Sequence, residues 1–193
     1  MLNRIVFQLR KILSWMLYSV LMRKFHFGSV IIKPMLIKGY KNIDIGKNVL
    51  IRNYARIEVV QPQNDSVIVI GNNVNIEQNV HIIGRCKIVI GNNVTITPNC
   101  SIVDVIHPYE DIWDETKIGN RISDKCKPVI IGEGTFIGTK SHVNPGVIIG
   151  KHCIIGANSV VTSNLPDYTV ATGAPAKIIR KFSAEENKWI KVE

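Results

Sequence analysis

The sequence predicts an all-β solenoid, a left-handed parallel β-helix of about five coils. From Ile131 to Pro166 an aliphatic residue recurs every six residues without interruption, and glycine follows it in four of the six repeats. A period of six fits neither a helix nor an ordinary strand. Three such hexads build one triangular coil, in which aliphatic side chains fill the interior and glycine or small residues occupy the corners.

The same register extends towards the N-terminus with interruptions. Hexads begin at Ile45, Ile51 and Ile57, stop at the polar stretch 61–66, and resume at Ile70 and continue to Ile102 with a two-residue slip after Lys87. The pentapeptide Ile-Gly-Asn-Asn-Val occurs at 70–74 and again at 90–94. Asparagine tolerates the left-handed conformation that such corners require. We therefore expect the β-helix to span residues 29–176, with 61–66 as a surface bulge.

The hexad pattern fails between His107 and Val129, where polar and aromatic residues replace it. An excursion of this length from a regular solenoid is typical of a functional loop, and we expect one over 108–128. After the β-helix, residues 177–193 form a basic tail. The spacing of Ser183 and Glu186 resembles a capping box, which predicts a short C-terminal helix.

Residues 1–28 form a basic and apolar N-terminal segment, predicted to be an amphipathic helix. Residues 1–43 contain eight of the net nine positive charges and no acidic residue. Because apolar residues alternate with these charges, an anionic membrane surface is a better expected partner than nucleic acid. The alternative is that the segment only caps the open core of the first coil.

The longest uncharged run in this segment, Ile12 to Met22, has 11 residues, fewer than the roughly 20 that span a bilayer. No small-residue cleavage signature follows it, so we expect a cytoplasmic protein, peripheral at the inner face of the plasma membrane if the segment binds lipid. The cysteines, at 86, 100, 126 and 153, show no C-x-x-C spacing. We expect small reduced side chains rather than disulfide partners or metal ligands.

At this point the chain resembles the hexapeptide-repeat acyltransferases, in the branch of the galactoside, maltose and nodulation-factor O-acetyltransferases and the polysaccharide or lipopolysaccharide O-acetyltransferases. The resemblance covers roughly residues 43–181. It rests on an ordered set of motifs: Ile90 to Cys100, His107-Pro108, Val129 to Gly138, Val143 to Gly150, and Ile155 to Thr162 followed by Gly173-x-Pro175-Ala176. It implies an acetyl-CoA-dependent O-acetyltransferase that needs no metal and assembles as a homotrimer. It also implies a glycan or lipid-linked sugar acceptor in cell-envelope polysaccharide synthesis.

In the enzymes that this chain resembles, the histidine of the His-Pro pair is the general base, which implies this role for His107. A histidine that changes charge near neutral pH suits removal of a proton from an acceptor hydroxyl. Asp104 lies three residues earlier and is a candidate to orient the imidazole, with capping of a corner as its alternative role. Glu77 occupies the position of an acceptor-binding asparagine in the sugar acetyltransferases, and Asn79 is the nearby substitute.

The resemblance also implies that CoA lies in a groove between neighbouring subunits. The expected contacts are the aromatic Phe136 beside Gly138 and Thr139, backbone groups of Ala157, and polar groups of Thr162 and Ser163. Positive charges for the phosphates would come from the basic tail, at Lys177, Arg180 and Lys181. A merely solvated tail is the alternative for these three residues.

Three other functions stay open. An N-acetyltransferase of a nucleotide-linked amino sugar would use the same coils and cofactor. A γ-type carbonic anhydrase would need three zinc-binding histidines, two of them five residues apart near the loop, but the fifth residue after His107 is Ile112. A scaffold without catalysis would fail to bind CoA.

Overall fold

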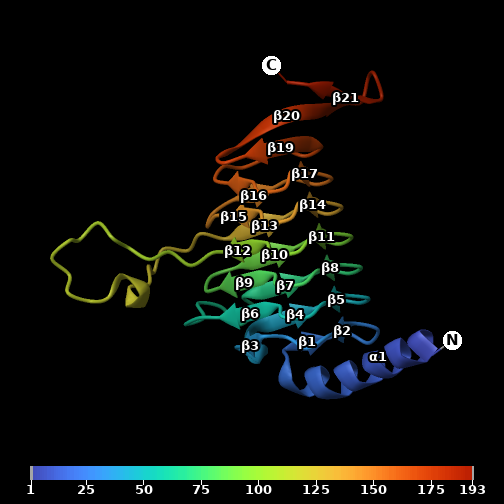
Figure 1. Cartoon of the computed structure of the whole chain (residues 1–193). Coiled ribbons are helices and arrows are strands. Elements are labelled where there is room, and N and C mark those ends of the chain that lie inside the picture. Colours follow the sequence, from blue (N-terminus) through green and yellow to red (C-terminus); the bar gives the residue numbers. More distant parts are fainter. Residues whose placement is uncertain (1, 193) are drawn as a thin grey trace.

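The structure is a computed structural model that describes residues 2–192, and its main body is a parallel β-helix. Three sheets form the sides of a prism, and each turn of the chain contributes one strand to each sheet (Figure 1). Over the described residues the turns number six, one more than expected. The additional turn is the first one, in which Phe25, Ile31 and Ile37 repeat every six residues before the register slips ahead of Ile45.

The strands of the three sides are as follows. Sheet A consists of β1 (Lys24–Phe25), β4 (Ile43–Ile45), β7 (Ile68–Ile70), β10 (Ile88–Ile90), β13 (Val129–Ile131) and β16 (Ile148–Ile149). Sheet B begins with β2 (Val30–Ile31), β5 (Leu50–Ile51), β8 (Asn75–Ile76), β11 (Thr95–Ile96), β14 (Phe136–Ile137) and β17 (Ile154–Ile155). Sheet C consists of β3 (Leu36–Lys38), β6 (Arg56–Val59), β9 (His81–Gly84), β12 (Ser101–Val103), β15 (His142–Val143) and β18 (Val160–Val161).

The core is a column of aliphatic side chains inside the prism. In sheet C, for example, Ile57, Ile82, Ile102 and Val143 stand in register on successive strands, and all four are fully buried. The hexad repeat therefore sets both the position of each turn and the filling of the interior.

Asparagines stabilise the corners between sheets A and B by stacking in a ladder. Asn48, Asn73 and Asn93 all have a left-handed backbone conformation, with φ of 56°, 55° and 58°. Each donates its side-chain amide hydrogen to the next residue of the ladder, at 3.2 Å and 3.3 Å between asparagines and 3.1 Å to Glu133. The left-handed conformation of Asn73 and Asn93 confirms the expected role of the repeated Asn-Asn motif, and the ladder adds side-chain hydrogen bonds to it.

Two segments leave the prism where the hexad pattern fails. Residues 61–66 form a loop between β6 and β7, as expected. The longer loop joins β12 to β13, contains the short 3-10 helix η2 (Ile118–Asn120), and projects far from the prism (Figure 1). A second 3-10 helix, η1 (Tyr40–Asn42), precedes β4.

The C-terminal segment contradicts the predicted helix. Sheet B continues into β19 (Thr169–Gly173), β20 (Ala176–Ser183) and β21 (Lys188–Lys191), and the last two pairings are antiparallel. The capping bond from Glu186 N to Ser183 Oγ does form, at 3.3 Å, but it closes a hairpin turn. Phe182 packs against Trp189 across this hairpin, with 5.6 Å between ring centroids, and such cross-strand aromatic pairs favour strands.

The N-terminal segment contains the one α-helix of the described residues, α1 (Leu2–Leu21), which crosses the open end of the first turn (Figure 1). Tyr18 and the following Met22 are buried in the same core as the β-helix. Among residues 2–192, no helix has the length and apolar character that crossing a membrane requires.

Candidate functional site

His107 lies where the chain leaves sheet C and enters the projecting loop. Its Nδ1 atom donates a hydrogen bond to the backbone carbonyl of Arg121, 2.8 Å away on the returning part of the loop. A carbonyl oxygen only accepts, so Nδ1 carries the proton and Nε2 is the basic nitrogen of the neutral ring. The imidazole therefore has a fixed tautomer and a free nitrogen, which a general base requires.

Arg121 is itself held by the loop. Its guanidinium donates to the carbonyl oxygens of Thr116 at 2.7 Å and Asp111 at 2.8 Å, and also to that of Asp114. These contacts close the loop on itself and fix the carbonyl that receives the His107 proton.

The hydrogen bonds of the Asp104 carboxylate go to backbone groups and not to His107, which favours the second of its two expected roles, capping of a corner. Its carboxylate accepts hydrogen bonds from the backbone N–H groups of Arg85 at 2.6 Å, Cys86 at 2.9 Å and Lys87 at 2.6 Å. Burial raises the pKa of this carboxyl group, and the three backbone donors act in the opposite direction. Asp104 therefore has the alternative role, capping the corner from which the loop departs.

The returning end of the loop is fixed to the same corner by a disulfide between Cys86 and Cys126, with a Cα–Cα distance of 5.4 Å. This corrects the expectation that none of the cysteines is a disulfide partner, whereas Cys100 and Cys153 are buried free thiols as expected. Arg85 adds hydrogen bonds to Ser123 O at 3.1 Å and Asp124 Oδ1 at 2.6 Å. Both ends of the loop, and hence His107, are thus anchored to the prism.

A cavity of about 450 Å³ lies between the outer face of sheet C and the loop, with His107 in its wall. It is lined by Arg56, Glu58, Val60, Ile83, Val103, Val105, His107, Gly119 and Ile122. Aliphatic side chains dominate this lining, and Arg56, Glu58 and His107 are its ionisable members. A cavity with an apolar wall and a few polar groups is typical of a small-molecule site.

Glu58 is the buried acid of this cavity. It accepts hydrogen bonds from Arg56 Nε at 3.0 Å and Lys38 Nζ at 3.3 Å. The Arg56 hydrogen bond holds the pKa of Glu58 below its usual range, burial opposes this, and Lys38 adds to the lowering. The sequence analysis missed Arg56 and Glu58, because charged residues two apart on an outer strand face are equally typical of a solvated surface.

The two expected acceptor-binding residues lie at the corner between sheets B and C, and neither lines the His107 cavity. Glu77 forms an ion pair with Arg52, 2.9 Å between Oε2 and Nε. Asn79 donates a hydrogen bond to Asn99 Oδ1 at 3.2 Å and lines a second, smaller hollow. Within this chain, the structure does not bring Glu77 or Asn79 to His107.

The expected cofactor contacts begin on the outer face of sheet B. Phe136 pairs with Ile154, which pairs with Val170, which in turn pairs with Arg180 of β20. Residues paired in this way share a face of the sheet, so they form a row with an apolar part and a basic end. Phe136 and Ile154 are each about two-fifths exposed, at 43% and 40%.

The register of β20 separates the three basic residues of the tail. A β-bulge shifts the pairing, so Lys177 pairs with Thr172 and Arg180 with Val170, while Lys181 pairs with the buried Thr169. Lys177 and Arg180 therefore share the outer face of the row, and Lys181 lies on the other side of the strand.

The remaining expected contacts occupy two different corners. Gly138, Thr139 and Ala157 lie together between sheets B and C, where Asn158 N donates to Thr139 O at 2.8 Å. A Cβ atom at Gly138 would lie 2.6 Å from Ala157 N, so only glycine permits this approach of the turns. Thr162 and Ser163 lie between sheets C and A, at the same edge of the prism as the His107 loop.

Within residues 2–192, the structure contains no group of three or more histidine, cysteine or acidic side chains arranged to hold a metal ion. The two buried thiols lie in separate turns, and Cys100 Sγ donates to Gly138 O at 3.1 Å.

Comparisons with known proteins agree with this architecture. A family model described as "Bacterial transferase hexapeptide (six repeats)" matches residues 128–163. The chain is 32% identical over 177 residues to the putative lipopolysaccharide biosynthesis O-acetyl transferase WbbJ of Escherichia coli strain K12, covering 89% of each chain. It is 37% identical over 124 residues to the putative acetyltransferase YJL218W of Saccharomyces cerevisiae, covering 63% of this chain and 60% of the relative.

Two solved structures have a similar fold. AntD, an N-acyltransferase from Bacillus cereus in complex with dTDP and 3-hydroxybutyryl-CoA, superposes with a TM-score of 0.71 at 20% identity over 90% of each chain. The hexapeptide-repeat containing acetyltransferase VCA0836 from Vibrio cholerae superposes with a TM-score of 0.59 at 24% identity, covering 93% of this chain and 86% of that chain.

Proposed function

Because the chain belongs to the hexapeptide-repeat acetyltransferase family, we propose that it transfers the acetyl group of acetyl-CoA to a sugar hydroxyl, with His107 as general base. The observation that supports this role most directly is the hydrogen bond from Nδ1 of His107 to the Arg121 carbonyl, beside a cavity of about 450 Å³. It leaves Nε2 unprotonated in the neutral ring and available to an acceptor.

In the proposed reaction, Nε2 of His107 removes the proton of the acceptor hydroxyl as its oxygen attacks the thioester carbonyl carbon. The tetrahedral intermediate then collapses, the carbon–sulfur bond breaks, and the imidazolium returns the proton to the CoA thiolate. The products are an acetyl ester and CoA with its free thiol. Holding both substrates beside His107 supplies the proximity part of the rate enhancement.

We place CoA along the outer face of sheet B. The row of Phe136, Ile154 and Val170 offers an apolar track for the pantetheine, and Arg180 with Lys177 offers charge for the phosphates at its end. Gly138, Thr139 and Ala157 border this track at the adjoining corner. Lys181 lies outside the proposed contact set because it faces the other way.

A complete site requires a second subunit in this proposal. The His107 loop leaves the corner between sheets C and A, which is the corner opposite sheet B in a triangular prism. The base and the proposed CoA track of one chain are thus on opposite sides of the prism. Packing of one chain's loop against its neighbour's sheet B would bring them together, and a closed trimer repeats this contact three times.

Mixed trimers provide the test of this arrangement. At acetyl-CoA concentrations below the native KM, His107→Ala and Lys177→Ala/Arg180→Ala should each be impaired alone. Co-assembled in equal amounts, they should recover activity at about a quarter of the sites, those with both groups intact. If each site lies within one chain, the mixture should be no more active than the average of its two components.

The acceptor we favour is a glycan or lipid-linked sugar in cell-envelope polysaccharide synthesis. The support is the 89% coverage of the Escherichia coli relative, whose name gives lipopolysaccharide biosynthesis and O-acetyl transfer. In this chain the His107 cavity would receive the sugar, with aliphatic side chains against its ring face and the Arg56–Glu58 pair for its polar groups. Glu77 and Asn79 could contribute from a neighbouring subunit.

N-acylation of a nucleotide-linked amino sugar is the second candidate function. The observation that favours it is the likeness in fold to AntD over 90% of each chain, in a complex with dTDP and an acyl-CoA. The same base and CoA track would serve an amine acceptor.

A product assay separates the two candidates. Purified protein is incubated with acetyl-CoA and a panel of nucleotide sugars, amino sugars and lipid-linked saccharides, and products are identified by a mass increase of one acetyl group. Mild alkali releases an O-acetyl ester but leaves an N-acetyl amide intact, so it reports the atom that was acetylated. No acetylated product and no acetyl-CoA binding would refute both functions.

A further inference from the structure

Helix α1 faces the β-helix with its more polar side. The side chains that α1 buries are Ser14 and Tyr18, with Lys11 half-buried beside them, and Met22 directly after the helix is buried as well. Ser14 Oγ accepts a hydrogen bond from Ile31 N at 3.3 Å, and the Tyr18 ring packs on Phe25 at 5.5 Å between centroids. Capping of the first turn is therefore carried out by a stripe that includes a serine, a tyrosine and a lysine.

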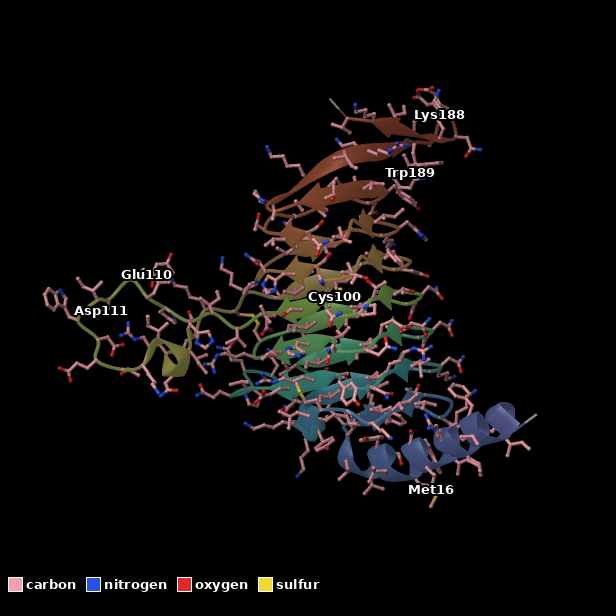
Figure 2. All side chains as sticks on the ribbon, in the orientation of Figure 1. Met16, Cys100, Glu110, Asp111, Lys188 and Trp189 are labelled. Carbon is pink, nitrogen blue, oxygen red and sulfur yellow. A yellow bond between two sulfur atoms is a disulfide. The ribbon has the colours of Figure 1, made fainter. Side chains whose placement is uncertain are left out.

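The opposite side of α1 is entirely apolar and exposed. At 3.6 residues per turn, residues three and four apart share a face, and the outward face contains only aliphatic residues and methionine. These are Ile5, Leu9, Ile12, Leu13, Met16 and Val20. Leu13 is 63% exposed, Met16 60% and Val20 84%, and Figure 2 shows Met16 pointing away from the prism.

This arrangement is the reverse of a surface helix in a soluble domain, whose apolar stripe faces the core. A contiguous exposed apolar face of this kind is typical of an interaction site. At 20 residues, α1 is about 30 Å long, and its outward face is flanked by Trp15, which packs edge-on against the exposed Phe27 at 6.0 Å.

The charges near this face identify its partner. Exposed basic side chains lie on α1 at Arg10 and in the segment that follows it, at Lys24, Lys33 and Lys41, and the first acidic residue of the chain is Asp44, which is buried and paired with Arg23. A second copy of α1 would bring the same positive charges together. An anionic surface with an apolar interior complements both features.

We propose that α1 docks on the surface of an anionic lipid bilayer, lying in its plane with the face of Leu9, Leu13, Met16 and Val20 inserted among the acyl chains. The helix stays folded against the β-helix through Tyr18 and Met22, so docking holds the whole prism on the membrane without a spanning segment. The residues of the outward face contact the lipid. Ser14, Tyr18 and Met22 keep their contacts with the first turn when the helix docks.

Docking would also fix the distance of the His107 cavity from the membrane surface. The meaning of this distance for the acceptor rests on the proposed function. The cavity is lined from β6, β9 and β12, in the second to fourth turns. At about 4.8 Å per turn, and with about 10 Å for α1, the cavity lies roughly 15 to 25 Å from the lipid contact. Sugars that project from a membrane-anchored lipid would reach this height.

The test is co-sedimentation of the full-length protein with vesicles of equal parts phosphatidylglycerol and phosphatidylcholine, and with vesicles of phosphatidylcholine alone. We expect binding to the anionic vesicles that is reduced at least about tenfold between about 0.05 M and 0.5 M salt. Leu13→Gln/Met16→Gln leaves the charge unchanged and touches no core residue, and should reduce binding at least about tenfold. Ile190→Gln, at the opposite end of the molecule, is the matched control and should bind like the native protein.

Vesicle binding does not depend on catalysis, so its outcome is separate from that of the acetylation assay. Native binding by Leu13→Gln/Met16→Gln, or no binding of the native protein to anionic vesicles, would overturn the proposal. Light scattering without lipid gives a further test. If Leu13→Gln/Met16→Gln forms a smaller assembly than the native protein, the outward face of α1 binds a second copy of the chain, and the proposal is overturned.

Discussion

His107 and Arg121 are joined by a hydrogen bond of 2.8 Å between the imidazole Nδ1 and a backbone carbonyl, across 14 residues of the projecting loop. The group that orients the candidate base is therefore part of the loop backbone. A backbone carbonyl cannot be removed by substitution, so the closure of the loop determines the position of the imidazole. Residues that fix the loop should consequently affect activity without touching a substrate.

Asp104→Asn should lower the free energy of unfolding by about 1 to 3 kcal/mol. An amide in place of the carboxylate turns an NH₂ group towards a backbone donor and leaves buried N–H groups without an acceptor. Urea unfolding measures the loss, and Asp124→Asn is the control, because that carboxylate is 94% exposed and its pair with Arg85 should contribute little. If Asp104→Asn instead has native stability and a reduced kcat, Asp104 acts on the His107 imidazole and not as a corner cap.

Cys86→Ser should destabilise the protein by about 3 to 4 kcal/mol, because the disulfide closes a chain segment with a sequence separation of 40. Dithiothreitol should lower the melting temperature of the native protein and leave that of the double variant Cys86→Ser/Cys126→Ser unchanged. Titration of four free thiols in the unfolded, unreduced native protein would contradict the assignment of this pair.

Glu58→Gln should destabilise the protein at neutral pH and much less in acid. The pKa of Glu58 is lowered by its hydrogen bond from Arg56 against the opposing effect of burial, so the folded state favours the carboxylate. The stabilisation is fully present above the unfolded value of about 4.3 and is lost as the pH falls through the folded pKa. Urea midpoints of native and variant protein at a series of pH values should converge in acid, and a constant difference would exclude this origin.

Lys177→Ala/Arg180→Ala should raise the KM for acetyl-CoA on the order of 10- to 100-fold, the loss of two charge-assisted contacts discounted for their exposure, with a similar kcat at saturation. Lys181→Ala removes the same charge from the opposite side of β20 and should leave this KM nearly unchanged. Steady-state kinetics of the native protein, the double variant, Lys177→Ala and Lys181→Ala provides the comparison. Equal effects of Lys177→Ala and Lys181→Ala would indicate a general attraction of anions by the tail.

The regular part of the fold could be predicted because each hexad requires a buried aliphatic residue at the same position. The aliphatic positions from Ile131 to Val161 are all buried in the structure, at the spacing seen in the sequence. The first turn was missed because Phe25 and Ile37 precede a slip of the register. The C-terminal hairpin was missed because the Ser183–Glu186 contact is the same in a helix cap and in this turn.

The site could be predicted only in part. His107 follows from its motif, but its partner depends on loop closure, which no local pattern encodes. The disulfide between Cys86 and Cys126 joins a corner of the prism to the same loop. It could not be predicted because the path of this loop follows no repeat. The side of β20 that each basic residue occupies depends on a bulge between Val170 and Ala171, which alternation alone does not reveal.

The central claim is that His107 removes the proton of the acceptor, and the most direct measurement is single-turnover acetyl transfer by His107→Ala at saturating acetyl-CoA and acceptor. The ring lies at the start of a loop and outside the core, so the variant should fold and bind acetyl-CoA as the native protein does. The rate should fall by roughly 10² to 10⁴, the contribution of a positioned base. A native single-turnover rate in this variant would contradict the claim.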